Sequence, residues 1–211
     1  MKSVRLFQCI ALLAVSSSAT AQFSPGNGQS GTSTERTYTG RQAYDDLSDF
    51  GGCFATKQSK DALKLLGTQP GSIDEARVYK ELFSKDQPCL TDLNGLSVQW
   101  QYVRGAVGEG FYARKVPLPP AYAAPHSLPA EKVQSVMDAA ICYADKHTPE
   151  ARSLIETTKP ETKEEEAAID ALLPNFKACL PPNMPKGFQI DPMILRYRIA
   201  EALWRLGWVH S

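Results

Sequence analysis

The sequence predicts an all-α protein in which a four-helix module of roughly 90 residues occurs twice in tandem, each copy closed by one disulfide. Three observations support this prediction. The chain can be aligned with itself, its apolar residues recur at helical spacing, and the cysteines that follow the N-terminal segment form an even set.

The N-terminal segment has the features of a secretory signal peptide. Lys2 and Arg5 precede an apolar run over residues 6–15, and small residues then end at Ala21. The run is too short to cross a bilayer as a helix, so we expect cleavage after Ala21 and export to the periplasm or the extracellular space, with no membrane span. Residues 22–40 are rich in Ser, Gly, Thr and Gln, a composition that predicts a disordered leader.

The self-alignment defines the two copies. Three pairs of stretches match, namely 53–66 with 142–155, 74–90 with 164–180, and 104–112 with 196–204. A period near ninety is too long for the common helical-array repeats, which indicates a tandem duplication of a small domain. We assign helical repeat 1 to residues 41–115 and helical repeat 2 to residues 130–211.

Each copy is expected to contain four helices. The first is predicted over residues 41–54 and 130–144, from apolar spacing. The second begins at a capping hydroxyl, Ser59 in one copy and Thr148 in the other.

The third helix begins at a capping box, Ser-x-x-Glu at residues 72–75 and Thr-x-x-Glu at 162–165. The fourth helix is predicted over 96–113 and 191–208, where apolar residues recur every four positions. Between the copies, residues 116–129 contain five prolines and predict a stiff linker.

The four cysteines that remain after cleavage are expected to pair within the copies. In each copy the chain leaves the first cysteine along one helix and returns along the next. The two helices run in opposite directions, so the second cysteine is expected to lie close to the first. This geometry predicts the disulfides Cys53–Cys89 and Cys142–Cys179. The rival interpretation is a metal or redox site, but the chain has no Cys-x-x-Cys and its histidines do not recur between the copies.

The fourth helices carry the best candidates for a role beyond packing. Arg104, Glu109 and Tyr112 recur as Arg196, Glu201 and Trp204, and small residues flank each glutamate. Arg and Glu five positions apart lie about 140° apart around a helix, so they cannot pair with each other. Reciprocal pairing between the copies, Arg104 with Glu201 and Arg196 with Glu109, is the arrangement we expect.

The net charge and the lack of known catalytic motifs argue against several classes of function. Removal of residues 1–21 leaves 21 basic and 23 acidic residues, a net charge of −2, which argues against nucleic-acid binding. The chain lacks a phosphate loop, a serine-hydrolase elbow and a zinc-protease motif, and no cofactor is expected.

Three hypotheses about function follow. The leading one is a non-catalytic exported protein that binds an envelope or secreted protein through helix faces. The alternatives are a hydrolase-like enzyme that uses Glu109 and Glu201 in a cleft between the repeats, and a carrier of a small ligand.

Overall fold

The computed structural model describes residues 40–83, 88–89, 100–181, 184 and 188–208. The predicted signal peptide and almost all of the predicted leader lie outside the described residues. The described part of the chain is all-helical, without strands. Its α-helices are α1 (Gly40–Lys57), α2 (Ser59–Leu66), α3 (Ile73–Phe83), α4 (Trp100–Ala113), α5 (Val136–Lys146), α6 (Thr148–Thr157), α7 (Lys163–Ala178) and α8 (Pro192–Arg205).

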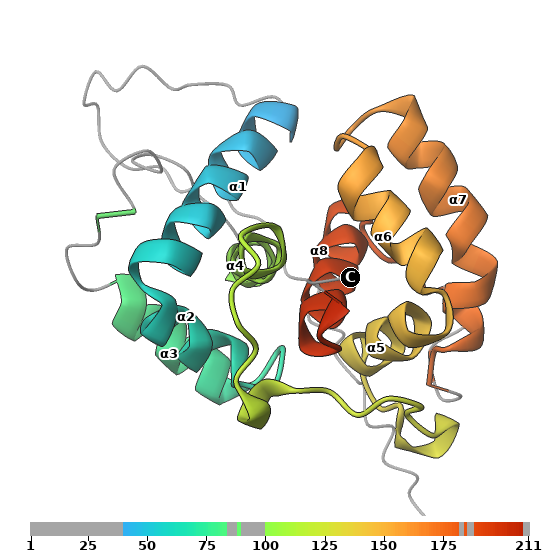
Figure 1. Ribbon diagram of the computed structural model, residues 1–211, viewed down its shortest axis with the longest axis horizontal. Coiled ribbons are helices and arrows are strands. Elements are labelled where there is room, and N and C mark those ends of the chain that lie inside the picture. The colour runs from blue at the N-terminus through green and yellow to red at the C-terminus, as the bar shows by residue number, and fades with distance from the viewer. Residues whose placement is uncertain (1–39, 84–87, 90–99, 182–183, 185–187, 209–211) are drawn as a thin grey trace, which may run out of the picture. The chain divides into compact units, whose positions relative to one another are not determined.

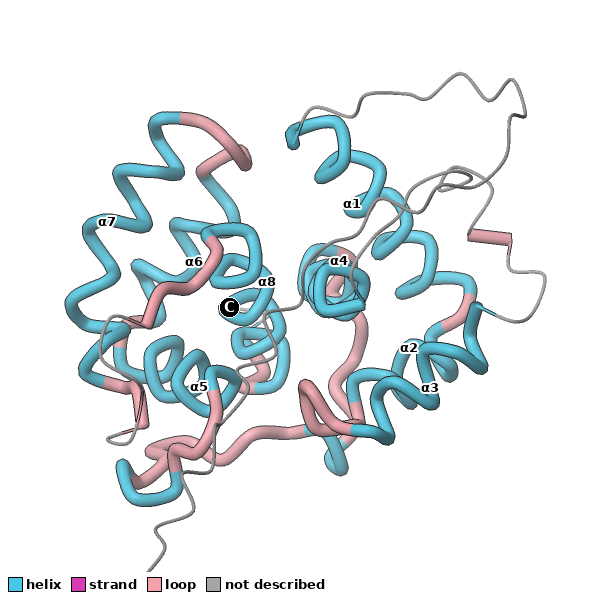
Figure 2. The backbone as a smooth tube through the Cα atoms, turned by 180° about the vertical axis from the view of Figure 1, so that it is seen from behind, coloured by secondary structure: helices cyan, strands magenta, loops and turns pink. Residues whose placement is uncertain are grey.

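Helices α4 and α8 lie next to each other at the centre, with α1, α2 and α3 on the α4 side and α5, α6 and α7 on the α8 side (Figures 1 and 2). Ten consecutive residues of α4 and ten of α8 are buried, so both helices are covered on all sides. A helix that is buried all round forms the core of the molecule and not its surface.

Glycines allow α4 to approach its neighbours closely. A Cβ at Gly110 would lie 2.3 Å from the Gly51 carbonyl oxygen of α1, and a Cβ at Gly105 would lie 2.3 Å from the ring of Tyr197 in α8. Both distances are far shorter than any normal carbon contact, so even alanine would push the helices apart. Gly110, which directly follows Glu109, therefore permits close packing of α4 on α1, and Gly105 permits close packing of α4 on α8.

Helix starts differ in detail from the sequence prediction. The helix expected from residue 130 begins at Val136, because Ser135 accepts a hydrogen bond from the Asp138 amide and the Asp138 carboxylate accepts one from the Ser135 amide. At α6, the Thr148 hydroxyl donates to the Ala144 carbonyl in the preceding helix and caps nothing. A hydroxyl can bond backward as well as forward, and here the preceding helix ends close enough to take it.

The start of α2 also differs, since its N-cap residue is Gln58 and not Ser59. The predicted start at residue 96 of the fourth helix lies outside the described residues, which show α4 from Trp100 onward.

Two disulfides tie helices α1 and α5 to segments that follow them in the chain. Cys53 in α1 is bonded to Cys89, and Cys142 in α5 is bonded to Cys179 at the C-terminal end of α7, with Cα–Cα distances of 5.7 and 5.9 Å. These are the pairs that the out-and-back geometry predicts. Each closes a chain loop of similar length, with sequence separations of 36 and 37.

The proline-rich stretch between α4 and α5 packs against α8. The Trp204 indole donates to the Val116 carbonyl at 2.9 Å, and the Ala124 amide donates to the Arg205 carbonyl at 2.8 Å. Within the described ranges, no helix is long and apolar enough to cross a membrane.

Candidate functional site

The candidate site is built on two turns of matching conformation, one between α2 and α3 and one between α6 and α7. In the first turn, Gly71 has a φ of +83°, its amide donates to the Glu75 carboxylate at 2.7 Å, and the Glu75 amide donates to the Ser72 hydroxyl at 3.1 Å. A positive φ turns the chain sharply before the helix begins. The carboxylate is thereby fixed beside the turn.

The second turn repeats this arrangement. Glu161 has a φ of +59°, its amide donates to the Glu165 carboxylate at 2.7 Å, and the Glu165 amide donates to the Thr162 hydroxyl at 3.3 Å. In each turn the carboxylate takes the amide that precedes the N-cap residue, one position earlier than in a standard capping box. The remaining oxygen of each glutamate faces the core.

Arg104 of α4 inserts its guanidinium into the first turn. Its Nη1 donates to the Leu65 carbonyl at 2.9 Å and to Glu75 Oε1 at 3.0 Å, and its Nη2 donates to the Leu66 carbonyl at 2.9 Å. The last carbonyls of a helix have no partner within the helix, and Arg104 supplies partners for those of α2. The opposite edge of the guanidinium faces Glu201 of α8, with Nε–Oε2 and Nη2–Oε1 distances of 3.1 and 2.7 Å.

Arg196 of α8 occupies the second turn in the same way. It donates to the carbonyls of Leu154 and Ile155 and to Glu165 Oε1, at 2.9, 3.0 and 3.2 Å. Its Nε donates to Glu109 of α4 at 3.0 Å. The structure thus brings together the two reciprocal pairs that the sequence predicts, and it adds Glu75 and Glu165 as a second carboxylate for each arginine.

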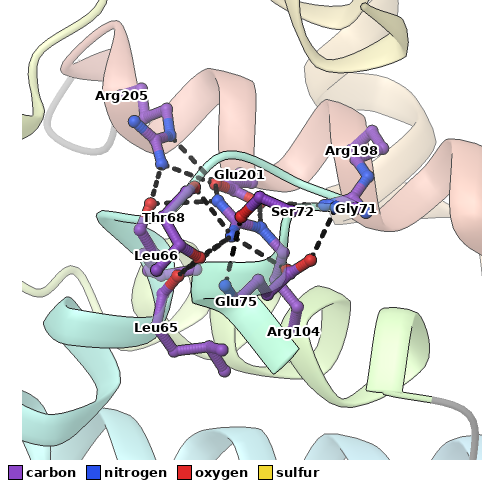
Figure 3. A network of polar contacts seen from close by, with 10 residues as sticks. All are labelled: Leu65, Leu66, Thr68, Gly71, Ser72, Glu75, Arg104, Arg198, Glu201 and Arg205. Carbon is purple, nitrogen blue, oxygen red and sulfur yellow. Dashed lines mark hydrogen bonds and ion pairs between the residues drawn. The ribbon is translucent and has the colours of Figure 1, made fainter. Parts of the chain in front are cut away.

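We call these clusters the first network (Glu75, Arg104, Arg198, Glu201 and Arg205) and the second network (Tyr44, Glu109, Glu165 and Arg196). Figure 3 shows the first network, in which Arg104 and Glu201 lie between the α2–α3 turn and α8. The side chains of Glu75, Arg104 and Glu201 are 0% exposed, so the centre of the network is closed to solvent, whereas Arg205 at its edge is 17% exposed.

The two networks differ in charge. Glu201 accepts from Arg198 at 3.4 Å and from Arg205 at 3.0 and 2.8 Å in addition to Arg104, so the first network holds three arginines and two glutamates. In the second network, Glu109 Oε2 accepts a hydrogen bond from the Tyr44 phenol at 2.8 Å, and one arginine faces two glutamates. The first network carries a formal charge of +1 and the second a formal charge of −1.

This difference moves the pKa values of the two inter-helix glutamates in opposite directions. Burial raises the pKa of Glu109, and the opposing effects of Arg196 and the Tyr44 phenol are too small to cancel it. Burial also disfavours the charged form of Glu201, but the surrounding guanidinium groups outweigh it, and its pKa is lowered well below the usual range. Glu201 is therefore a firmly ionised carboxylate, whereas Glu109 is held at a cost in desolvation.

The recurring aromatic pair does not form a common site. Tyr112 donates its phenol to Glu156 of α6 at 2.5 Å. Trp204 is fully buried and packs edge-to-face on Phe111, with ring centroids 5.0 Å apart. Both residues join helices, and neither lies in the two networks.

Several residues of the networks were not among the sequence candidates. Arg198 and Arg205 align with alanines, Ala106 and Ala113, 92 residues earlier in the chain, so a search for recurring charged residues cannot find them. Tyr44 is not a candidate from sequence either, because its phenol has a polar role only when Glu109 of α4 lies beside it.

In both networks the carboxylates are bound to arginine side chains, and the arginines also bind the last carbonyls of α2 and α6. In the part of the chain that the structure describes, no group of three or more His, Cys, Asp or Glu residues is placed to hold a metal ion. Comparisons with family models, with curated proteins and with solved structures each returned no match to this chain.

Proposed function

We propose that the chain is an exported, non-catalytic protein made of two tandem helical repeats, and that it binds a protein partner in the periplasm or extracellular space. The single observation that carries the non-catalytic part is the burial of Glu109 and Glu201, which are 6% and 0% exposed and each bound to arginine. A general acid or base must reach its substrate within hydrogen-bond distance. Carboxylates engaged in this way favour a structural role over the hydrolase-like alternative.

The duplication is supported by the equivalence of the two turns and of the two arginines. Gly71, Glu75 and Arg104 make the same contacts as Glu161, Glu165 and Arg196, at the offsets of 90 and 92 residues that the self-alignment requires. The two turns even share a positive φ at the residue before the N-cap. Two unrelated segments would not be expected to match in this detail. We take the repeats as residues 41–115 and 130–211, joined by the linker 116–129.

Export is supported by the two disulfides together with the signal-like first 21 residues. Disulfides form and persist in oxidising compartments such as the bacterial periplasm and the extracellular space. The export proposal predicts an N-terminus at Gln22 in the protein recovered after secretion, and a mass lower by four hydrogen atoms than that of the fully reduced mature chain. Edman sequencing and intact-mass measurement test both statements.

Partner binding is tested by photo-crosslinking from the exposed faces of the helices. Ile73 at the start of α3 is 90% exposed and is a suitable first position, and Lys163 at the start of α7 is its counterpart in the other repeat. With a photoreactive residue at each position in turn, and then along α3 and α7, we expect a discrete adduct with one protein at a subset of positions. Absence of a discrete adduct at all positions would exclude stable binding through these two faces.

The hydrolase alternative is tested by comparing the hydrolytic activity of the purified protein with that of a variant that lacks the Glu109 carboxylate. A Glu109→Gln variant that folds should leave any hydrolytic activity of the purified protein unchanged if the carboxylate is structural. Loss of a measurable hydrolysis in that variant, with folding intact, would reverse the proposal in favour of an enzyme.

A further inference from the structure

A cavity of about 330 Å³ adjoins the second network. Its floor is formed by two members of that network, Tyr44 and Arg196, and its rim by the first turns of α1 and by the turn between α6 and α7. The rim carries the side chains of Arg41, Asp45, Thr158 and Lys159. The volume lies at the lower end of the range for sites that hold small molecules.

The exposed rim of this cavity carries two cations, Arg41 and Lys159, and one carboxylate, Asp45. Arg196 at the floor adds no net positive charge, because it is paired with Glu109 and Glu165. Arg41 and Lys159 are exposed, whereas Arg196 is buried and donates to Glu109, Glu165 and the end of α6. The two rim cations are therefore the groups that can contact a ligand, with the Thr158 hydroxyl at the side.

This positive rim is specific to the second network. The turn residues Thr158 and Lys159 correspond to Thr68 and Gln69 in the first repeat, so the lysine replaces a neutral side chain. In the 89-residue register, Arg41 corresponds to Ala130. Both halves of the chain therefore have the turn, but only the cavity beside the α6–α7 turn has the two additional cations, Arg41 and Lys159.

We infer that this cavity, which we call the α1/α6 pocket, binds a small organic or inorganic anion through Arg41 and Lys159. Guanidinium and ammonium groups are the usual partners of carboxylate and phosphate oxygens. Asp45 lowers the net charge of the rim and limits binding to compact anions of low charge. This inference is independent of partner binding through helix faces, because the pocket is concave and involves different residues.

Titration with two small anions tests whether the α1/α6 pocket binds an anion. The full chain with its disulfides formed is titrated by calorimetry with inorganic phosphate and, separately, with succinate, and the backbone amide signals of Thr158 and Lys159 are followed by NMR. We expect saturable binding of at least one probe, with shifts at those two amides. Phosphate and succinate separate a phosphate ligand from a carboxylate ligand.

Three variants then decide the assignment. Lys159→Gln should weaken binding by about tenfold, a loss equivalent to ~1.4 kcal/mol. Asp45→Asn should strengthen it by about threefold, because it removes the only rim carboxylate in the described pocket. Lys132→Gln removes an exposed lysine that does not line the pocket, and it should leave the affinity unchanged.

The rim residues to be changed are exposed, so the variants are expected to fold. Circular dichroism and the urea midpoint of each variant verify that it does. The inference is overturned if neither probe binds saturably, if Lys132→Gln weakens binding as much as Lys159→Gln, or if Asp45→Asn weakens it.

Discussion

The charge difference between the two networks predicts that the same substitution has unequal effects at two equivalent positions. Glu201 accepts five hydrogen bonds from three arginines, whereas Glu109 accepts one from Arg196 and one from the Tyr44 phenol. Glu201→Gln would leave three buried or half-buried guanidinium groups with Glu75 as their remaining carboxylate in the network. Glu109→Gln would leave Arg196 with Glu165.

The magnitudes follow from the cost of an unpaired buried charge. Breaking a buried pair from one side costs about 3–5 kcal/mol, so we expect Glu201→Gln to lower the free energy of unfolding by about 4 kcal/mol. For Glu109, the neutral amide avoids the desolvation that raises the pKa of the carboxyl group, and the net loss should be about 1 kcal/mol. In a chain of this size the larger value corresponds to a decrease in Tm of roughly 8–16 °C.

Urea unfolding followed by circular dichroism, with both disulfides intact, measures the two free energies. Asp74→Asn serves as a control, because its ion pair with Arg77 is exposed and should contribute less than ~1 kcal/mol. Equal losses for Glu109→Gln and Glu201→Gln, or a larger loss for Glu109→Gln, would refute the charge difference on which the reasoning rests.

Three further predictions concern pH, the disulfides and helix packing. Because folding lowers the pKa of Glu201, the stability that its ionised carboxylate contributes should be present above about pH 4 and should be lost progressively as the pH falls further. Because folding raises the pKa of Glu109, this residue should favour the folded state at low pH and cost stability as the pH rises. Urea midpoints of wild type and each Gln variant between pH 3 and 8 check both signs. Replacing both cysteines of the Cys142–Cys179 bridge by serine should cost about 4 kcal/mol in the chain-entropy model, measured as the shift in urea midpoint. Gly51→Ala should destabilise by about 3 kcal/mol despite the better helix propensity of alanine, because its Cβ would lie 2.0 Å from the Ala106 carbonyl oxygen, and thermal unfolding measures the effect.

The parts of the fold that the sequence predicts are those that depend on local signals or that occur twice. The all-helical character, the disulfide pairs and the Ser72 and Thr162 caps all follow from spacing along the chain. The pairing of Arg104 with Glu201 was inferred from helix geometry, because the glutamate five residues away on its own helix points in another direction.

The parts that were missed are those where one residue has two roles or has no counterpart. The capping box predicts only one role for Glu75. Its second carboxylate oxygen binds Arg104, and no local sequence pattern indicates this contact. Arg198 and Arg205 occur only once, so the recurrence that identified the other charges could not identify them. The start of α5 was misplaced because the Ser135 cap interrupts an apolar pattern that itself continues back to Val133.

The exchange of glutamates between α4 and α8 has a consequence for the origin of the chain. Arg104 and Arg196 each rely on a carboxylate from the opposite half, so one half alone would bury a guanidinium with part of its charge unmatched. If the halves descend from one module, that module needed a second copy of itself to complete its core. An isologous homodimer with two-fold symmetry, in which residue i of one subunit meets residue j of the other and the reverse, has this property. Gene fusion would then have made the association permanent and freed each half to diverge, as the unequal charges of the two networks illustrate.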